Sequence, residues 1–195
     1  MKPLLLDFPT LFQTERLQVR KPFPGDGAEV YEAIQASLED LVPWIPINAE
    51  TEESAEEIVR NAHGQFLLRE TLDFHLYDKV SGTFIGAITL KPENWDIPKF
   101  SLHFWLHSAY TKQGYMTEAV KGAIQFAFDK LGARRIEIRT DATNINACSL
   151  AERLEFILEG TMENDFLAPD GSLRDARVYA KINSKTLAFG ECLFL

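Results

Sequence analysis

Hydrophobic residues recur along the chain at two spacings, which together predict an α+β fold. Apolar residues that alternate with polar ones are typical of strands, whereas apolar residues three and four positions apart are typical of helices. Strands are predicted at 17–19, 72–77, 83–90, 100–106, 135–140, 156–165 and 173–182. Helical stripes are formed by Ala28, Tyr31, Ile34 and Leu38, then by Ala55, Ile58, Val59, Ala62 and Phe66, then by Val120, Ala123, Ile124, Ala127, Phe128 and Leu131, and a short helix is predicted at 147–154. The order β-α-α-β-β-β-α-β-α-β-β predicts one mixed central sheet flanked by helices.

The composition favours one domain in a reducing compartment. The chain has 195 residues, 46% of them hydrophobic and 25% charged, so we expect a single domain over 1–195. No apolar run approaches the roughly 20 residues that cross a bilayer, and the N-terminal segment lacks the apolar core and cleavage site of a signal peptide. The two cysteines, Cys148 and Cys192, are too few for a disulfide framework or a structural zinc site. These features predict a cytoplasmic protein without a membrane partner.

The net charge of −9 narrows the choice of partners. Such a chain has no basic surplus with which to replace the counterions of a nucleic acid, so nucleic-acid binding is not expected. An acidic surface attracts cationic partners, such as an amine or a basic protein segment. Acidity also raises solubility by itself, and the sequence does not separate the two interpretations.

A polar turn joins a strand to a helix at residues 105–119 (WLHSAYTKQGYMTEA). Such a turn binds anions, because a helix N-terminus leaves backbone N–H groups free and the helix dipole adds positive potential. Gly114 has no side chain to block an approaching phosphate, although a glycine there also suits a simple tight turn. The turn lacks the Lys-Ser/Thr pair of a P-loop and the three glycines of a dinucleotide fingerprint. It therefore predicts a phosphate cradle of another kind.

Four segments in order along the chain resemble the GNAT N-acetyltransferases, and within them the RimJ/RimL branch that acetylates the N-termini of ribosomal proteins. Residues 110–120 (YTKQGYMTEAV) resemble the Q/R-x-x-G-x-G/A acetyl-CoA motif of that family. Residues 14–20 resemble its opening strand, 144–160 its N-x-x-S…ERLGF-x-x-EG segment, and 174–180 its closing R-D-x-x-x-Y-A strand. The resemblance spans residues 14–183 and implies the GNAT fold and acetyl transfer to a primary amine.

The resemblance implies acetyl-CoA as co-substrate and indicates which residues hold it. The segment that faces the cofactor comprises Leu106, Lys112, Gln113, Gly114, Tyr115, Met116 and Thr117. Asn144 matches the asparagine that orients the pantetheine arm, although an asparagine there also suits a helix N-cap. Thr111 and Met116 depart from the family motif, which has glutamine or arginine and a small residue at these positions, and Lys112 stands where a glycine is common. Lys112 could neutralise phosphate charge.

Acetyl transfer needs a base that takes a proton from the amine, and three residues are candidates. Glu93 and Asp96 precede the central strand, where the RimL type carries an acidic residue. His103 lies on that strand, where some relatives place a histidine or glutamate, and a histidine titrates near pH ~6.5. A packed or hydrogen-bonded strand histidine is the alternative. His103 and His107 lack a third metal ligand, so no metal is expected.

The sequence offers no evident acid for the departing thiolate. Ala147 occupies the position of the serine in this branch, and Ala151 occupies the position of the tyrosine in other GNAT enzymes. A CoA thiolate can leave unassisted or take a proton from water. Glu155 replaces the family glycine before Phe156, and it is strained if the turn needs a positive φ.

The acceptor stays open at this stage. The resemblance implies a protein N-terminal α-amine that attacks directly, without an acyl-enzyme; the alternatives are a small amine (a polyamine or an aminoglycoside) and an acyl-CoA-binding protein with little turnover. Trp44 and Trp95, both in loops close to prolines, either line the acceptor groove or cap the core. The apolar tail at 187–195 (LAFGECLFL) either adds a strand or is buried in a partner subunit, as in a homodimer.

Overall fold

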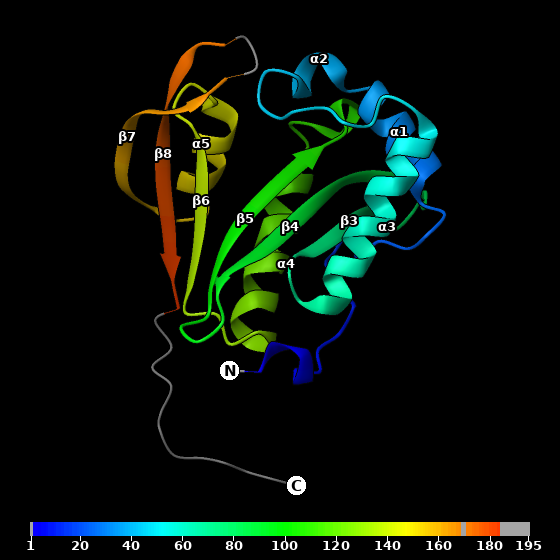
Figure 1. Cartoon of the computed structure of the whole chain (residues 1–195), viewed down its shortest axis with the longest axis horizontal. Helices are drawn as coiled ribbons and strands as arrows, with labels where there is room; N and C mark the ends of the chain where they lie inside the picture. Colours follow the sequence, from blue (N-terminus) through cyan, green and yellow to red (C-terminus); the bar gives the residue numbers. More distant parts are fainter. Residues whose placement is uncertain (1, 169–170, 184–195) are drawn as a thin grey trace, which may run out of the picture.

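The computed structural model describes residues 2–168 and 171–183, and within them a mixed sheet of eight strands carries helices on both faces (Figure 1). The strand order is β1-β2-β3-β4-β5-β6-β8-β7. The strands are β1 (Leu11–Gln13), β2 (Leu17–Arg20), β3 (Leu72–Asp78), β4 (Phe84–Asn94), β5 (Lys99–Leu106), β6 (Arg135–Asp141), β7 (Ile157–Leu167) and β8 (Leu173–Ile182). The helices are η1 (Pro3–Leu5), α1 (Gly27–Gln35), α2 (Leu38–Leu41), α3 (Glu52–Leu68), η2 (Ser108–Tyr110), α4 (Tyr115–Lys130) and α5 (Ile145–Arg153). The predicted α+β class with a mixed sheet is confirmed.

The sheet opens between its fifth and sixth strands in spatial order, β5 and β6. β5 and β6 run parallel and pair only near their starts, where Lys99 lies opposite Arg135 and Ser101 opposite Glu137. Beyond these residues the two strands diverge toward their carboxyl ends (Figure 1). Every other neighbouring pair of strands in the sheet is antiparallel. The divergence opens a gap in the sheet beside the last residues of β5 and the N-terminus of α5.

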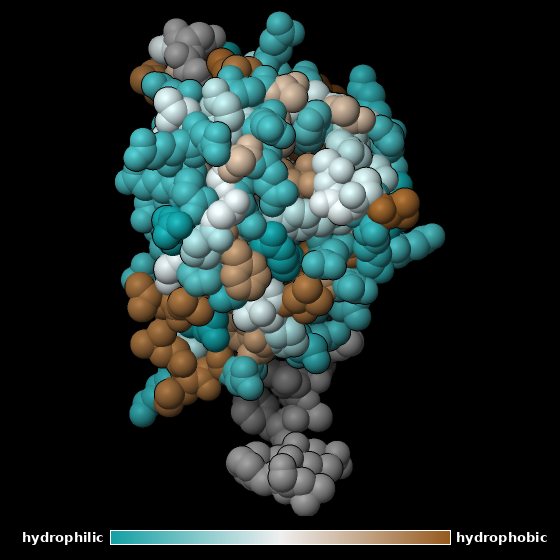
Figure 2. All heavy atoms as spheres, turned by 90° about the vertical axis from the view of Figure 1, so that its right-hand side faces the viewer, coloured by the Kyte–Doolittle hydropathy of each residue, from teal (hydrophilic) through white to brown (hydrophobic). Residues whose placement is uncertain are grey.

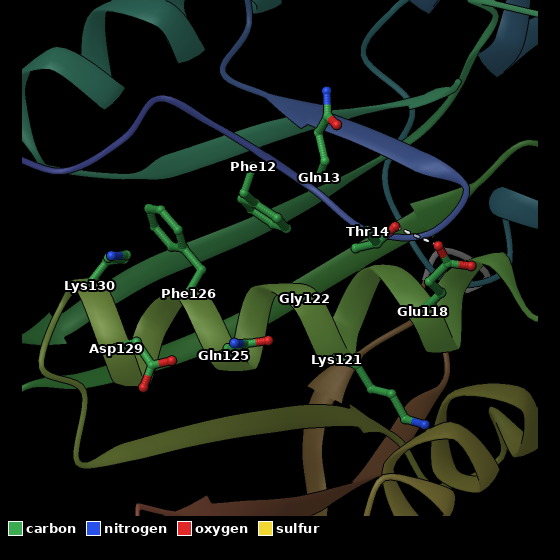
Figure 3. A pocket seen from close by; sticks show the side chains of 10 residues that line it. All are labelled: Phe12, Gln13, Thr14, Glu118, Lys121, Gly122, Gln125, Phe126, Asp129 and Lys130. Carbon is green, nitrogen blue, oxygen red and sulfur yellow. Dashed lines mark hydrogen bonds between the residues drawn. The ribbon is translucent and has the colours of Figure 1, made fainter. Parts of the chain in front are cut away.

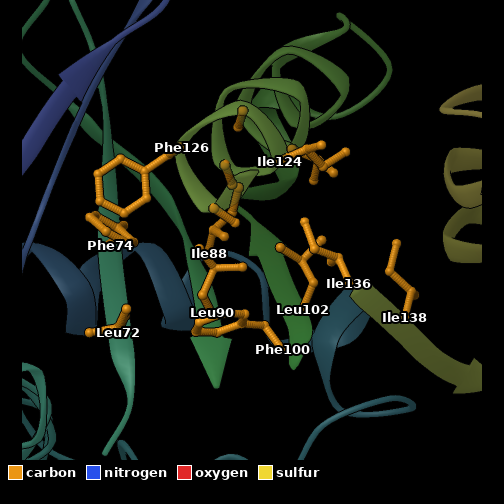
Figure 4. Packing of buried hydrophobic residues seen from close by; sticks show 14 of the residues in the cluster. Leu72, Phe74, Ile88, Leu90, Phe100, Leu102, Ile124, Phe126, Ile136 and Ile138 are labelled. Carbon is orange, nitrogen blue, oxygen red and sulfur yellow. The ribbon is translucent and has the colours of Figure 1, made fainter. Parts of the chain in front are cut away.

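The main core lies between the sheet and α4. Phe126 of α4 packs edge-on against Phe74 at 5.2 Å between ring centroids, and Ile124 lies over the strands beside Ile136 (Figure 4). A smaller cluster on the opposite face joins α1 and α3 to the sheet; its buried members are Val30, Ala33, Val59, Tyr77 and Phe84. The outer surfaces of these two helices are largely hydrophilic (Figure 2), as expected of amphipathic helices that cover a sheet.

The first helix buries only part of the stripe that the sequence predicted, in which Ile34 packs against the smaller cluster. Gly27, Val30 and Ala33 are buried, whereas Ala28 is exposed. The helix is rotated because α1 lies directly on α3: a Cβ on Gly27 would come within 2.5 Å of the Glu56 Cα. The sequence pattern also missed η1, β1 and α2, which are only three or four residues long and too short for a hydrophobic period.

Two of the expectations from the sequence concern membrane spanning and the apolar C-terminal segment. Within residues 2–168 and 171–183 no helix is long and apolar enough to cross a membrane. The apolar segment 187–195, with Cys192, lies outside the described residues.

Candidate active site

A cleft of about 380 Å³ fills the gap between β5 and β6. Leu102, His103 and Phe104 line it from β5, and Ile138 to Asp141 line it from β6. The rest of the wall is formed by Pro43, Trp44, Ile45, Asn144, Ala147, Asp165, Phe166 and Ala176. Three of the residues predicted from the sequence, Trp44, His103 and Asn144, therefore meet in one cavity although they lie far apart in the chain.

The N-terminus of α4 follows β5 through η2 and carries no side-chain cap. Gly114 is the N-cap residue, with φ +85°, and no side chain accepts a hydrogen bond from the first turn of the helix. Residues 111–114 are exposed, and the N–H groups of 113–117 form no hydrogen bond with any described residue. Uncapped N–H groups at the positive end of a helix dipole bind anions. The predicted cradle residues Lys112 to Thr117 thus lie together at a helix end that is open to solvent.

A lysine occupies a left-handed conformation within this turn. Lys112 has φ +58°, a region that a glycine enters without cost and that costs other residues about 1 kcal/mol or more. The family motif commonly has glycine at this position, so the departure noticed in the sequence corresponds to real backbone strain.

Arg16, which the sequence pattern showed only as part of a strand, contacts two residues of the turn before α4 and holds it in place. Its Nη1 donates to the Gln113 carbonyl at 3.0 Å, and its guanidinium carbon lies 4.1 Å from the centroid of the Tyr115 ring. Its Nε donates to Glu118 Oε2 at 2.7 Å, and Thr14 also donates to Glu118 (Figure 3). The motif at 14–20 contained Arg16, but no spacing in the sequence connected it with the turn almost one hundred residues later.

Asn144 acts as the N-cap of α5 and also lines the cleft. Its Oδ1 accepts the Ala147 N–H at 3.1 Å. Among the described residues its side-chain NH₂ group has no hydrogen-bond partner, so this donor remains available toward the cavity. The two roles that the sequence left as alternatives use different atoms of the same amide and are therefore compatible.

His103 lies on β5 at the wall of the cleft and belongs to a short polar chain. Its Nε2 is 3.3 Å from Ser101 Oγ, and Ser101 Oγ donates to Glu93 Oε1 at 2.8 Å. Although the residue is exposed at the surface, the protein around the ring desolvates it and lowers its pKa; Lys91 lowers the pKa further, and Glu93 opposes both. The pKa of His103 is consequently below its ordinary value of about 6.5, and the ring is neutral near pH 7.

Two predicted site residues lie elsewhere, which corrects the expectation that they flank the cleft. Asp96 is in the turn between β4 and β5, where its N–H donates to Asn94 Oδ1 at 2.8 Å. Trp95 packs edge-on against Phe100 at 5.1 Å and donates its Nε1–H to the Arg69 carbonyl, so it caps the core. Both precede β5, whereas the cleft is lined by residues 102–104 within that strand.

The positions that could have held an acid for the thiolate are apolar. Ala147 lines the cleft and is 8% exposed, whereas Ala151 is fully buried. Cys148 is buried, with its Sγ 3.8 Å from the Asp141 carbonyl oxygen. Neither alanine can supply a proton, as the sequence indicated.

The lining of the cleft combines aromatic rings with a charged pair. Trp44, Phe104 and Phe166 line it, and the Arg139 guanidinium donates to Asp165. The Arg139 Nε to Asp165 Oδ2 distance is 2.9 Å. The sequence pattern did not single out Arg139 or Asp165, because charges that alternate along strands usually mark a solvated face.

Two other hollows contain none of the predicted site residues. One, of about 390 Å³, lies between β1 and α4 (Figure 3), and one of about 510 Å³ lies between α4 and α5. Within the described part of the chain no group of three or more His, Cys, Asp or Glu residues could hold a metal ion.

The fold and the uncapped helix beside a split sheet define an acyl-transferase architecture, and comparison with known proteins gives the family. Residues 16–157 match the family described as the acetyltransferase (GNAT) domain. The chain belongs to this family and is a GNAT-type acetyltransferase.

Individual relatives agree with this assignment. YdaF of Bacillus subtilis (strain 168), named as a candidate ribosomal N-acetyltransferase, is 25% identical over 172 residues, which cover 85% of this chain and 91% of YdaF. The ribosomal-protein-S5-alanine acetyltransferase of Vibrio fischeri has the same fold, with a TM-score of 0.82 at 21% identity, covering 91% of this chain and 98% of that one. The microcin C7 self-immunity acetyltransferase MccE, solved with acetyl-CoA and AMP, has a TM-score of 0.83 at 17% identity, covering 90% and 98%.

Proposed function

We propose that this protein transfers the acetyl group of acetyl-CoA to a primary amine, and that the amine is the N-terminal α-amine of a protein. The observation that supports this most strongly is the uncapped N-terminus of α4 at the end of β5, beside the cleft where β5 and β6 diverge. The names of YdaF and of the Vibrio fischeri enzyme favour a ribosomal-protein N-terminus as the acceptor.

The residues present suit acetyl-CoA, whose thioester supplies the activated acetyl group. The N–H groups of residues 113–117 would bind the pyrophosphate, and Gly114 leaves room for it. The Asn144 NH₂ group would donate to an amide carbonyl of the pantetheine arm. Lys112, exposed in the same turn, adds positive charge. The cradle thus retains the means to bind a pyrophosphate despite its departures from the motif.

His103 is the base in this proposal. It is neutral near pH 7 and lines the cleft, so it can take one proton from the acceptor ammonium. An α-ammonium has a pKa of ~7.8 against ~10.4 for lysine, which makes its deprotonation easier by about 3.5 kcal/mol. The amine then forms the new C–N bond as the C–S bond breaks. The second proton on nitrogen is transferred through solvent to the departing thiolate, because Ala147 and Ala151 offer no acid.

A small amine remains the second candidate for the acceptor. The observation that favours it is the aromatic wall of Trp44, Phe104 and Phe166 in a cleft of only about 380 Å³. A peptide N-terminus needs a groove that continues beyond the reacting amine, whereas a small amine needs only the pocket.

Calorimetric titration with acetyl-CoA, with free CoA for comparison, tests the donor half of the proposal. We expect micromolar binding, and loss of binding in Gly114→Trp, which fills the approach to the uncapped amides. Gly132→Trp is the matched control, because Gly132 also has a positive φ but lies at the other end of α4. A Cβ on Gly132 meets open space, and one on Gly114 meets only the Arg16 Nη2 at 3.4 Å. Absence of binding by the wild-type protein would refute acetyl-CoA as the donor.

Acetylation of a panel of acceptors, read by mass spectrometry, tests the acceptor half. The panel contains peptides with free N-termini, the same peptides with blocked N-termini and an internal lysine, polyamines and aminoglycosides. We expect turnover with the free N-termini only. Turnover confined to the small amines would replace the protein acceptor by a small molecule. Tight binding of acetyl-CoA without any turnover would leave an acyl-CoA-binding protein.

A further inference from the structure

The outer face of the sheet carries a hydrogen-bonded chain that ends at the proposed base. Ser101 and His103 lie two residues apart on β5, so their side chains point to the same face. Lys91 of β4 lies opposite Ser101, and Glu93 follows two residues later, where it reaches the Ser101 hydroxyl at 2.8 Å. Ser101 in turn lies 3.3 Å from His103 Nε2.

The chemistry of the three groups fixes the direction of both hydrogen bonds. A serine hydroxyl has one hydrogen, and a carboxylate only accepts, so Ser101 gives its hydrogen to Glu93. Ser101 Oγ is then left as an acceptor toward His103. The Nε2 atom of the neutral ring must therefore carry the hydrogen, and Nδ1 keeps the lone pair.

We propose that Ser101 is a positioning residue whose hydroxyl links Glu93 to His103 and orients the ring so that Nδ1 takes the proton of the acceptor amine. The inference rests on the proposed function and assigns Glu93 a supporting role in place of a direct one. In the step, an N–H bond of the acceptor ammonium breaks and an N–H bond forms at Nδ1. The imidazolium keeps its Nε2–H bond to Ser101 and afterwards releases the Nδ1 proton to solvent.

The same chain adjusts the charge of the ring. When His103 becomes positive, its hydrogen bond to Ser101 and the nearby Glu93 carboxylate both stabilise it. The other charged groups on this face either act on the ring or have partners of their own. Lys91 opposes the positive charge, and Asp73 accepts a hydrogen bond from Thr89. The remaining groups form ion pairs: Glu137 with Lys99, Glu159 with Arg135, and Asp165 with Arg139. Removing Glu93 should consequently lower the pKa of His103 and make it a weaker base.

Nuclear magnetic resonance of the protein alone tests the chain without any substrate. His103 is one of four histidines, and its ring signals are assigned by comparison with His103→Gln. We expect a His103 Nε2–H signal protected from exchange with water in the wild type and in Ser101→Thr, but lost in Ser101→Ala. We also expect a lower His103 pKa in Glu93→Gln. Glu159→Gln, which removes another carboxylate of the same face, is the matched control and should change neither.

Kinetics then test whether the chain acts in the reaction. Ser101→Ala and Glu93→Gln should each lower kcat about tenfold, while the double variant lowers it no more than about twentyfold, because the two residues act as one unit. The acid limb of the kcat/KM profile should move to lower pH in Glu93→Gln, together with the pKa seen by resonance. Ser101→Thr should retain most of kcat.

The outcomes separate this inference from the proposed function. Rapid exchange of Nε2–H in the wild type, an unchanged His103 pKa in Glu93→Gln, or multiplicative losses in the double variant would each overturn it. A protected Nε2–H and a lowered pKa in a protein that acetylates no acceptor would support the hydrogen-bonded chain and refute the transferase activity that it was inferred to serve.

Discussion

Arg16 and Glu118 join the residue before β2 to the first turn of α4 across 102 residues of sequence, with 2.7 Å between Nε and Oε2. Glu118 also accepts the Arg16 N–H and the Thr14 hydroxyl. Burial opposes the charge on Glu118, but the hydrogen bonds from Thr14 and Arg16 outweigh it and hold the pKa of Glu118 below its ordinary value. Because Arg16 also binds Gln113, this contact fixes the cradle relative to the sheet.

Replacing Glu118 with glutamine should weaken its contact with Arg16 and lower the free energy of unfolding by an amount that depends on pH. A carboxyl group whose pKa is lowered by folding stabilises the protein above the unfolded pKa of about 4.3, and this stabilisation is lost as the pH falls through the folded pKa. Arg16 is 39% exposed and partly screened by solvent, so we expect a loss of only about 1–2 kcal/mol at pH 7. Urea denaturation should show this difference shrinking as the pH falls below about 4.3 and through the lowered pKa of folded Glu118.

A control variant and a binding measurement complete the test of Glu118. Glu53→Gln, an acidic residue in the first turn of α3, is the control and should change stability by less than about 0.5 kcal/mol. Affinity for acetyl-CoA should fall several-fold in Glu118→Gln because the cradle loses its support. If the difference in the free energy of unfolding between wild type and variant did not change with pH, the charge of Glu118 would not be what stabilises its contact with Arg16.

Glu155→Gly should stabilise the protein. Glu155 has φ +59°, a left-handed conformation that costs a non-glycine residue about 1–2 kcal/mol. A glycine there avoids this strain, but it loses more conformational entropy on folding, which cancels part of the gain. Its ion-pair contact to Lys181 at 3.7 Å is exposed and contributes little. We expect a net gain of about 0.5–1 kcal/mol, seen as a rise in Tm of about 2–3 °C. Glu155→Ala keeps the Cβ and should show no such rise; an equal rise in both variants would mean that removal of the charge is responsible.

The sequence predicted the long elements and the turn before α4 because both are local. The stripe of α4 and the turn around Gly114 each lie within one short segment, so spacing alone places them. The positive φ of Glu155 and Lys112 was also foreseeable, since each stands where the family has glycine. These features depend on neighbours in sequence and need no knowledge of the tertiary structure.

The cleft could not be predicted in the same way, because it depends on how far β5 and β6 pair. Proximity in sequence placed Asp96 and Trp95 near His103, but they lie in the turn before β5, whereas the cleft is lined by residues 102–104 of that strand. Alternation along β5 puts Ser101 beside His103, yet Glu93 reaches Ser101 only through the hairpin register. That register shifts between Pro92 and Asn94, an irregularity that no hydrophobic period reveals.

Asn144 offers a way to separate its two roles with one pair of variants. Asn144→Asp keeps an oxygen that accepts the Ala147 N–H, so α5 stays capped, but it lacks the NH₂ group that faces the cleft. We expect Tm to stay within about 1 °C of the wild type and acetyl-CoA affinity to fall about tenfold or more. Asn144→Ala removes both functions and should also cost about 1 kcal/mol of stability. If calorimetry gave the same affinity for Asn144→Asp and the wild type, Asn144 would be only a helix cap.

Ala147→Ser restores the hydroxyl that the family branch has at this position and tests whether the reaction needs an acid. Ala147 lines the cleft and is 8% exposed, so one added oxygen meets the cavity rather than the core. A thiol has a pKa of about 8.5, which makes its thiolate a good leaving group near neutral pH without assistance. We therefore expect kcat to change by less than about twofold, measured as release of free thiol with a saturating acceptor. Cys148→Ser, buried behind the cleft wall, controls for a serine placed on this helix without access to the cavity. A tenfold rise in kcat in Ala147→Ser alone would show that protonation of the thiolate limits the wild-type enzyme.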